Sequence, residues 1–376
     1  MLHDSQCQAA RLTRRELFGL LGAGAAAVAL PDLAAGAKPI EFPKKAIIRT
    51  VLRDLPPESL SGGATLFHEH LSLAPDFMPR WMAYFRAQNP PRGGNGAATP
   101  PPAAPPSSEP YFMQDLDLMT DEMHAAAKDG AACIVDGGHP DMGRSLDFLK
   151  KLSTKSGMPI VASCGYYSQP FYPPEVASMS EDQIADELIR QAFNEPVGAI
   201  GEIGTWDVMT SDERKVFRAV SKVHLATNLP IFTHTNFGKG AIEQLDIFES
   251  MGVSPSRVVI GHVGGLVDPE VKVHKAICKR GAFVGFDRQG GAGDARQVPM
   301  VMALIDAGYA DNLLFAADFS NGQQLKHNGG PGYAKTLTLF VPKLRDAGVK
   351  EETLHGILVD NPRRFLAFVP KKSAKR

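Results

Sequence analysis

Cysteine is scarce in this chain of 376 residues, which contains only four. Four cysteines are too few for a disulfide-bonded scaffold of this length. Cys7 lies in an N-terminal segment considered below, and Cys133, Cys164 and Cys278 lie inside apolar runs. We therefore expect three buried thiols, and no nucleophilic cysteine, because none has a positioned base nearby in the sequence.

The chain also lacks an excess of one sign of charge, and it lacks long apolar segments. The 40 Lys and Arg nearly balance the 41 Asp and Glu, for a formal net charge of −1. Such a chain has no field that attracts a polyanion, so nucleic-acid binding is not expected. No apolar stretch after residue 40 approaches the ~20 residues that span a bilayer, so no stable membrane anchor is expected. The 44% hydrophobic and 22% charged residues exclude wholesale disorder.

The N-terminus has the organisation of an export signal. Adjacent arginines in Thr13-Arg14-Arg15-Glu16-Leu17-Phe18-Gly19 precede the apolar run Leu20–Leu30, and Ala34-Ala35-Gly36-Ala37 follows. This resembles a twin-arginine signal, which a receptor of the twin-arginine export machinery reads on folded proteins. We predict a signal peptide over residues 1–37, cleaved after Ala37, and a periplasmic or secreted protein. A membrane anchor or an amphipathic helix is the alternative for this segment.

The mature chain, residues 38–376, alternates short apolar runs with helical patterns. The eight predicted strands are Ala64–His68, Ala131–Asp136, Pro159–Cys164, Gly198–Glu202, Pro230–His234, Val258–His262, Ala282–Phe286 and Leu313–Ala317. Predicted helices between them include Gln114–Lys128, Gly143–Thr154, Glu181–Phe193, Asp212–Thr227 and Gln297–Ala307. Eight such βα units in one α/β domain predict a TIM (β/α)8 barrel. The competing open doubly wound sheet lacks a G-x-G-x-x-G turn after its first strand.

One stretch interrupts this alternation. Residues 89–110 (NPPRGGNGAATPPPAAPPSSEP) are rich in Pro, Gly, Ala and Ser, and form a loop insertion after the first strand. In a barrel this loop belongs to the face on which active sites form. Two interpretations remain open: a solvated insertion without a role, or a mobile lid.

Histidines and carboxylates recur where the predicted strands end. His68 and His70 are two apart on the first strand, so both side chains can point into the barrel mouth while Glu69 faces away. Four later strands end with the remaining members of the set, which are Glu202, His234, His262 and Asp318. Strand ends of a barrel surround one opening. Four imidazoles and two carboxylates suit two divalent ions, with zinc first and manganese or cobalt as alternatives.

These residues resemble the phosphotriesterase family of the amidohydrolase superfamily. The resemblance covers nearly the whole mature chain. It includes the segments His68-Glu69-His70-Leu71, Val135-Asp136-Gly137-Gly138, Gly201-Glu202-Ile203-Gly204-Thr205, Thr233-His234-Thr235-Asn236-Phe237, Gly261-His262, Phe286-Asp287-Arg288-Gln289-Gly290 and Asp360-Asn361-Pro362-Arg363-Arg364-Phe365.

The resemblance implies a binuclear metal centre. His68, His70 and Asp318 would hold one metal and His234 and His262 the other, with a bridging residue and a bridging hydroxide between them. The bridge is a carboxylated lysine in phosphotriesterase itself. Here it is Glu202, as in the branch called phosphotriesterase homology proteins. This departure argues against efficient organophosphate hydrolysis.

The expected mechanism is attack of the bridging hydroxide on a carbonyl or phosphoryl centre. Two cations lower the pKa of a shared water toward neutrality. Asp318 would be the catalytic residue that takes the proton and passes it to the leaving group.

Three further residues are candidates for substrate binding. Arg288 resembles an arginine of the lactonase branch and suits a carboxylate, sulfonate or lactone oxygen, although an ion pair with Asp287 or Asp294 is an equal alternative. By resemblance Tyr167 would touch the bridging hydroxide, or else form an aromatic pocket wall. His139 follows the second strand and is expected to line the mouth.

We therefore predict an exported binuclear metal-dependent hydrolase of a small ester, lactone or amide. Phosphotriester hydrolysis is one alternative, supported only by the family. A non-catalytic periplasmic binding protein for a small molecule, on the same barrel, is the second. Barrels of this family often pair, so a homodimer is the assembly to test.

Overall fold

The computed structural model describes residues 40–89 and 111–372. The predicted signal peptide and, apart from Asn89, the predicted insertion lie outside these residues and stay predictions. Within the described residues, eight parallel strands form one sheet whose neighbours follow chain order. They are β3 (Ala64–Glu69), β4 (Ala131–Asp136), β5 (Ile160–Cys164), β6 (Val197–Thr205), β7 (Ile231–Thr235), β8 (Val258–Ile260), β9 (Phe283–Phe286) and β10 (Leu313–Phe315). Each overlaps one predicted strand, and the TIM barrel is confirmed.

The seam between the first and last strands is closed at their carboxyl ends. The backbone N–H of Asp318 donates to the carbonyl of His68 at 3.1 Å. The buried carboxylate of Glu69 accepts hydrogen bonds from the backbone N–H groups of Ala317 and Phe319, both at 2.8 Å. Burial raises the pKa of Glu69 to about 8. Glu69 thus faces away from the barrel mouth, as predicted, and joins β3 to the segment after β10.

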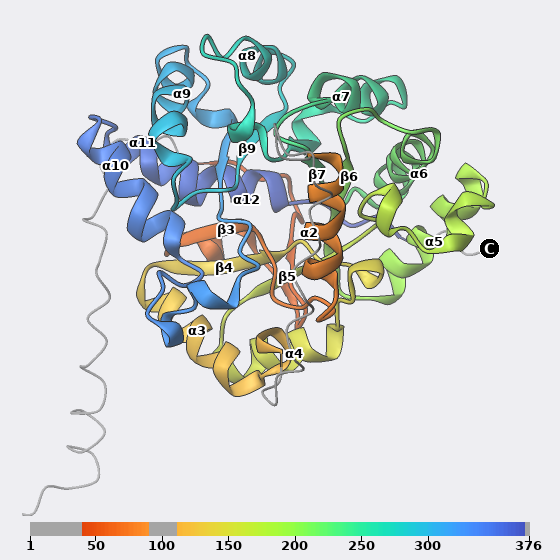
Figure 1. Ribbon diagram of the computed structural model, residues 1–376, viewed down its shortest axis with the longest axis horizontal. Coiled ribbons are helices and arrows are strands. Elements are labelled where there is room, and N and C mark those ends of the chain that lie inside the picture. The colour runs from red at the N-terminus through yellow and green to blue at the C-terminus, as the bar shows by residue number, and fades with distance from the viewer. Residues whose placement is uncertain (1–39, 90–110, 373–376) are drawn as a thin grey trace, which may run out of the picture.

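Helices surround the strands, as Figure 1 shows. They are α3 (Leu116–Lys128), α4 (Leu146–Ser156), α5 (Glu181–Asn194), α6 (Ser211–Thr227), α7 (Ala241–Ser250), α8 (Lys272–Lys279), α9 (Asp294–Asp306), α10 (Val341–Asp346), α11 (Glu351–His355) and α12 (Asn361–Leu366). Capping boxes begin α5, at Ser180, and α6, at Thr210. The five predicted helices are confirmed within about three residues at each end. Gly143, predicted as the start of one of them, has φ +85° and precedes α4.

Two apolar layers hold the barrel together. One lies between the strands and the helices, and the other fills the interior with alternate strand residues, among them Phe67, Val135, Val161, Phe232 and Leu314. A short antiparallel pair, β1 (Ile48–Arg49) and β2 (Asp54–Leu55), packs against the interior layer and covers its amino end. The carboxyl end is left for polar side chains.

One helix, α2 (Phe77–Gln88), belongs to neither the barrel nor its outer layer. It lies in the connection between β3 and α3, and in Figure 1 it is drawn inside the ring of outer helices. Sequence patterns did not predict it. It packs on the side chains of Tyr167, Phe171 and Trp206, and we call α2 with these three residues the aromatic cap.

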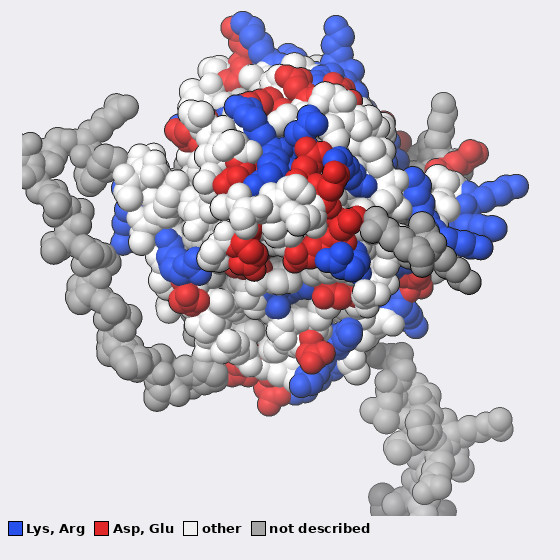
Figure 2. All heavy atoms as spheres, turned by 90° about the vertical axis from the view of Figure 1, so that its right-hand side faces the viewer, with Lys and Arg blue, Asp and Glu red and all other residues white. Residues whose placement is uncertain are grey.

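The outer surface mixes both signs of charge. Figure 2 shows acidic and basic side chains next to each other on the face that lies at the right of Figure 1, where α5 and α6 are found. Arg218 and Lys222 of α6 pair there with Glu181 of α5 at 2.8 and 2.6 Å. Among the described residues, no helix has the length and apolarity needed to cross a membrane.

Candidate metal centre

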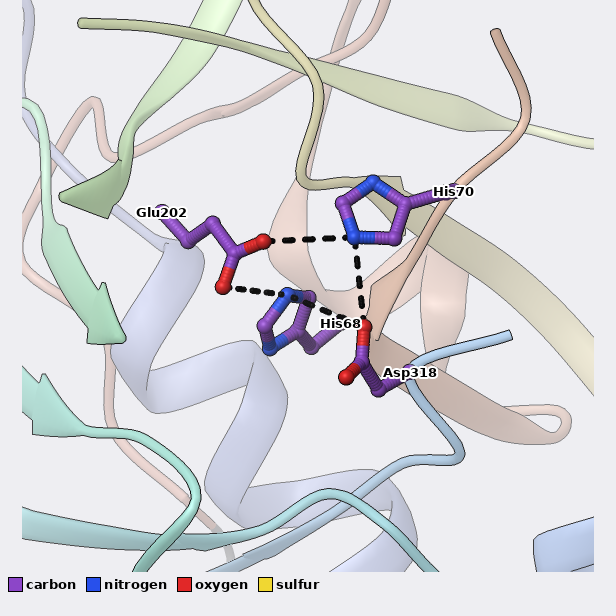
Figure 3. Close-up of side chains that lie close together, drawn as sticks. All are labelled: His68, His70, Glu202 and Asp318. Atoms are coloured by element: carbon purple, nitrogen blue, oxygen red, sulfur yellow. Dashed lines mark ion pairs between the residues drawn. The ribbon is translucent and has the colours of Figure 1, made fainter. Parts of the chain in front are cut away.

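The six predicted ligand residues converge at the carboxyl end of the barrel. We call them the ligand ring; they are His68, His70, Glu202, His234, His262 and Asp318. Figure 3 shows four of them around one point. His70 Nε2 lies 3.2 Å from Glu202 Oε1 and 3.2 Å from Asp318 Oδ1, and His68 Nε2 lies 3.4 Å from Glu202 Oε2. These four residues form the first group of converging donor atoms.

Glu202 also belongs to a second group. Its Oε2 lies 2.9 Å from His234 Nδ1 and 3.3 Å from His262 Nε2. All four histidines of the ligand ring therefore contact one carboxylate, which is almost fully buried. Glu202 is positioned to bridge two cations.

Local irregularities in the strands turn these side chains inward. Strand register shifts between Leu66 and Glu69 in β3 and between Ile200 and Ile203 in β6. Such shifts change which side of the strand a residue faces, and they bring His68 and Glu202 into the interior. His262 and Asp318 were predicted at strand ends, but β8 and β10 end two or three residues earlier, and both residues have a positive φ, +59° and +50°. That backbone costs about 1–3 kcal/mol per residue and recurs at functional sites.

A glycine makes room for two of the imidazoles. A Cβ on Gly137, which follows β4, would lie 2.9 Å from His68 Cδ2 and 3.3 Å from His70 Cε1. The side-chain-free position allows the rings to approach the β4 backbone closely.

Asp287 is the important residue that sequence reasoning missed. It is fully buried, with Oδ2 2.9 Å from His68 Nδ1 and Oδ1 2.9 Å from His262 Nδ1. A carboxylate that accepts from Nδ1–H fixes the tautomer and leaves Nε2 as the coordinating atom. Its position at the end of a strand, like that of the six predicted ligands, is the signal that could have found it.

The ion-pair partner of Arg288 is neither of the two residues that the sequence suggested. Its Nε lies 3.0 Å from Asp318 Oδ2. Asp287 is occupied by the two histidines, and Asp294 pairs with Lys343 at 2.6 Å. The suggested ion pair of Arg288 with Asp287 or Asp294 is therefore wrong.

The donor set fits divalent cations. His68 Nε2 is buried, has no hydrogen-bond partner and points at two carboxylates. Glu202, Asp287 and Asp318 carry three negative charges and Arg288 carries one positive charge, so the site needs further positive charge, from protonated imidazoles or from a metal. Buried charge of this kind is stable only when it is paired or coordinates a metal. Imidazole with carboxylate suits zinc, manganese or cobalt.

Electrostatics couple the ring members strongly. Burial lowers the pKa of His68, but Glu202 and Asp287 outweigh it and raise that pKa well above its usual value. Burial raises the pKa of Glu202, but His68 and His234 outweigh it and bring that pKa well below its usual range. Protons and cations therefore compete for the same ring nitrogens.

A pocket of about 260 Å³ opens onto the ligand ring. Its lining combines ring members with cap residues and Arg288: His70, Phe77, Met78, Trp81, Tyr167, Glu202, His234, Arg288, Asp318 and Ser320. Tyr167 Oη lies 3.1 Å from His234 Nδ1 and accepts a hydrogen bond from Trp81 Nε1 at 2.9 Å. Two of the three predicted substrate-binding residues, Arg288 and Tyr167, thus line the pocket.

His139 does not. Its ring is fully buried, and Nε2 lies 3.1 Å from the backbone oxygen of Glu202 while Nδ1 contacts Asp141. Asp141 also accepts from the backbone N–H of Tyr167, at 2.8 Å. The expectation that His139 lines the mouth is wrong, because His139 supports the backbone behind the site.

Comparison with known proteins agrees with this geometry. A sequence model of the phosphotriesterase family matches residues 48–366. The phosphotriesterase homology protein of Escherichia coli (strain K12) is 34% identical over 254 residues, 65% of this chain and 86% of that protein. N-acetyltaurine hydrolase of Salmo salar is 26% identical over 344 residues, 85% of this chain and 98% of that protein. The structure of a resiniferatoxin-binding protein from Rhodobacter sphaeroides, 29% identical, superposes with a TM-score of 0.72 over 85% of this chain and 94% of that one.

Proposed function

Because the chain belongs to the phosphotriesterase family and is a metal-dependent hydrolase, we propose that it cleaves the amide bond of a small N-acyl compound that carries an anionic group. N-acyl taurines and N-acyl amino acids are the substrates we test first. The observation that carries this proposal is Arg288, which stands in the pocket wall beside the ligand ring.

Arg288 is suited to an anionic substrate group. Its Nε donates to Asp318, and the described residues accept no other hydrogen bond from the guanidinium. The side chain is 28% exposed, so its remaining N–H groups can reach a carboxylate or sulfonate in the pocket. A cation held by Asp318 would share the charge of that carboxylate, which would leave Arg288 more capacity for the substrate anion.

The remaining roles follow from the ligand ring. His68, His70 and Asp318 would hold one cation and His234 and His262 the other, with Glu202 between them. Held there, two cations would supply a water of lowered pKa and polarisation of the scissile carbonyl. The pKa of Asp318 lies well below its usual range because His70, His262 and Arg288 outweigh burial, so its carboxylate is ionised at neutral pH. Asp318 accepts the proton of the attacking water and delivers it to the leaving nitrogen.

The volume of the pocket and the names of related proteins both favour a small amide substrate. A volume of about 260 Å³ is below the ~300–1,000 Å³ of sites for drug-sized ligands. The Salmo salar relative, which this chain matches over almost its full length, is named for hydrolysis of an N-acyl taurine. A lactone or a linear ester would use the same ring and Arg288, and the family supports a phosphotriester. The Rhodobacter sphaeroides neighbour is named as a binding protein, which favours non-catalytic capture as a second candidate.

Hydrolysis by metal-loaded protein decides among these candidates. Proton release follows the lactones, esters and phosphotriester, and release of the free amine follows the N-acyl compounds, because at neutral pH the amine takes up the proton that the new carboxylic acid loses. The panel contains N-acetyltaurine, N-acetyl amino acids, lactones, linear esters and a phosphotriester, with Glu202→Ala as the blank. We expect turnover of the N-acyl compounds that the blank lacks. Turnover of lactones or esters alone would contradict the amide proposal, and binding without any turnover would favour the second candidate.

We also propose that the protein acts after export. The Arg14-Arg15 pair and the apolar run support a twin-arginine signal. Replacing both arginines by lysine should retain the chain in the cytoplasm of a bacterial host. Exported protein that still begins at Met1 would contradict cleavage after Ala37.

A further inference from the structure

The aromatic cap is a separate unit placed over the pocket. Of the α2 residues, only Phe77 is fully buried. The side chains beneath the helix form an apolar cluster distinct from both barrel layers, consisting of Leu73, Phe77, Met113, Met142, Tyr167, Phe171 and Trp206. Phe77, Met78 and Trp81 of α2 form one wall of the pocket.

Trp81 makes the one side-chain hydrogen bond that joins α2 to the site in the described chain. Its indole Nε1–H donates to Tyr167 Oη at 2.9 Å, while its ring stacks on Phe85 at 5.2 Å with planes 8° apart. Indole nitrogen can only donate, so Tyr167 must accept and keeps its own proton for another partner. His234 is within reach of that proton, with Nδ1 3.1 Å and Nε2 3.2 Å from Tyr167 Oη.

Trp81 forms part of the pocket wall. Its indole stacks on Phe85, which packs on Phe237 at 6.0 Å, and the Arg288 guanidinium lies 5.6 Å from the Phe237 ring. These contacts hold the indole at the wall. A substrate chain that extends past this wall must displace the Trp81 indole.

We propose that Trp81 is a specificity-determining and positioning residue: its indole restricts the substrate to short acyl groups, and its N–H orients the Tyr167 hydroxyl toward the ligand ring. The inference rests on the proposed amide hydrolysis for its substrate class. Its two parts are tested with different variants.

Acyl length tests the restriction. Metal-loaded wild type, Trp81→Ala and Trp81→Phe are compared on N-acetyl-, N-butanoyl- and N-hexanoyltaurine. Trp81→Ala should raise the hexanoyl-to-acetyl ratio of kcat/KM by about 10-fold or more, because a pocket discriminates at least this much per excluded methylene. Trp81→Phe should keep the wild-type ratio. Met82→Ala, on the same helix but outside the pocket, is the matched control, and an unchanged ratio in Trp81→Ala would overturn the restriction.

A double-mutant cycle tests the positioning. Trp81→Phe should lower kcat for N-acetyltaurine about 2- to 10-fold with little change in KM, the effect of one lost hydrogen bond. In a Tyr167→Phe background the same substitution should have no further effect, since the hydroxyl it orients is gone. Effects that multiply in the double variant would show that Trp81 does not act through Tyr167.

Fluorescence separates failure of the cap from failure of the proposed function. The chain has two tryptophans, so Trp206→Phe leaves Trp81 as the single emitter. Titration of this protein with N-acetyltaurine or N-hexanoyltaurine should change Trp81 emission. The longer compound should bind at least about tenfold more weakly. That result without any turnover would retain the cap and reject hydrolysis. Equal affinities, or no change in emission on binding seen by calorimetry, would reject the role of Trp81.

Discussion

The ligand ring and the aromatic cap both line one pocket but are built differently. The ring takes its side chains from the ends of barrel strands far apart in sequence, and closure of the barrel brings them together. The cap depends on one helix with a single fully buried residue, held by a small aromatic cluster. One part of the pocket lining thus holds charge on a rigid frame, and the other part has little anchoring, so its local opening costs less free energy.

The difference indicates a division of roles. Chemistry needs donor atoms held to within about 0.5 Å, which strand ends provide. Selection among substrates needs a wall that can change without disturbing those atoms, and an inserted helix provides that wall. Substitutions in the ring should therefore abolish activity, and substitutions in the cap should redirect it.

The largest effect is expected at the centre of the ring. Glu202→Ala removes the carboxylate that all four histidines contact, so metal content should fall and turnover should drop at least ~10³-fold, equivalent to several kcal/mol of transition-state stabilisation. Metal analysis and release of the free amine from N-acetyltaurine measure both. Glu175→Ala, an exposed glutamate, is the control. A fully metal-loaded and active Glu202→Ala protein would show that neither metal binding nor turnover depends on this carboxylate of the ring.

Asp318 separates metal binding from proton transfer within the ring. Asp318→Asn keeps an oxygen near the ring but cannot accept a proton, so we expect retained metal and a loss of turnover of about 10²- to 10⁴-fold. The assay is single-substrate kinetics on protein with verified metal content. Wild-type rates in the metal-replete variant would refute the assigned role.

Asp287 supports His68 and His262 from behind the ring, so its substitution should affect metal affinity more than the rate of hydrolysis. Asn offers one oxygen acceptor, so Asp287→Asn cannot accept from Nδ1–H of both His68 and His262. Metal affinity should fall about 10- to 100-fold, measured by competition with a chelator. Asp268→Asn is the matched control, because Asp268 contacts His274 at 3.4 Å outside the ring. Equal loss in both variants would deny Asp287 a special role.

Most of the ring could be predicted from the sequence, because each member follows an apolar run that itself predicts a strand. His68, Glu202 and Asp318 needed no knowledge of their neighbours beyond strand order. Asp287 shares this strand-end position, but its role as the common partner of His68 and His262 exists only once the two histidines meet. His139 was placed correctly after β4, but the orientation of its ring is set by Asp141 and not by strand alternation.

The cap could not be predicted from local pattern. Residues 77–88 are rich in aromatic and apolar side chains, but their partners Met113, Tyr167 and Trp206 are between 25 and 129 positions away along the chain. Helix propensity is weak evidence where packing decides. The sequence does explain the barrel beneath, where apolar runs alone indicate the strands.

Substitution of one phenylalanine in each region allows a direct comparison of how much the two regions contribute to stability. Phe232 lies in the barrel interior and Phe77 in the cap, and both are at most 2% exposed. Phe232→Ala should lower the free energy of global unfolding by about 3–5 kcal/mol. Phe77→Ala should mainly speed amide hydrogen exchange along α2 and change global unfolding less. Equal losses of global stability would show that cap and barrel unfold as one unit.

The smallest effect is expected at His224 on the outer helix α6, which lies outside both regions and serves as a reference. The His224 ring is buried, with Nδ1 2.7 Å from the carbonyl of Leu229, and burial lowers its pKa below the usual value. The unfolded chain therefore binds a proton more readily, so the stabilisation by His224 is fully present above about pH 6.5 and is lost as the pH falls through the lower, folded pKa. Urea unfolding of wild type and His224→Gln between pH 5 and 8 measures the difference, in which the pH dependence of the ligand ring cancels. We expect a shallower loss of stability at low pH in the variant; equal slopes would mean that acid sensitivity originates elsewhere, with the ring the first candidate.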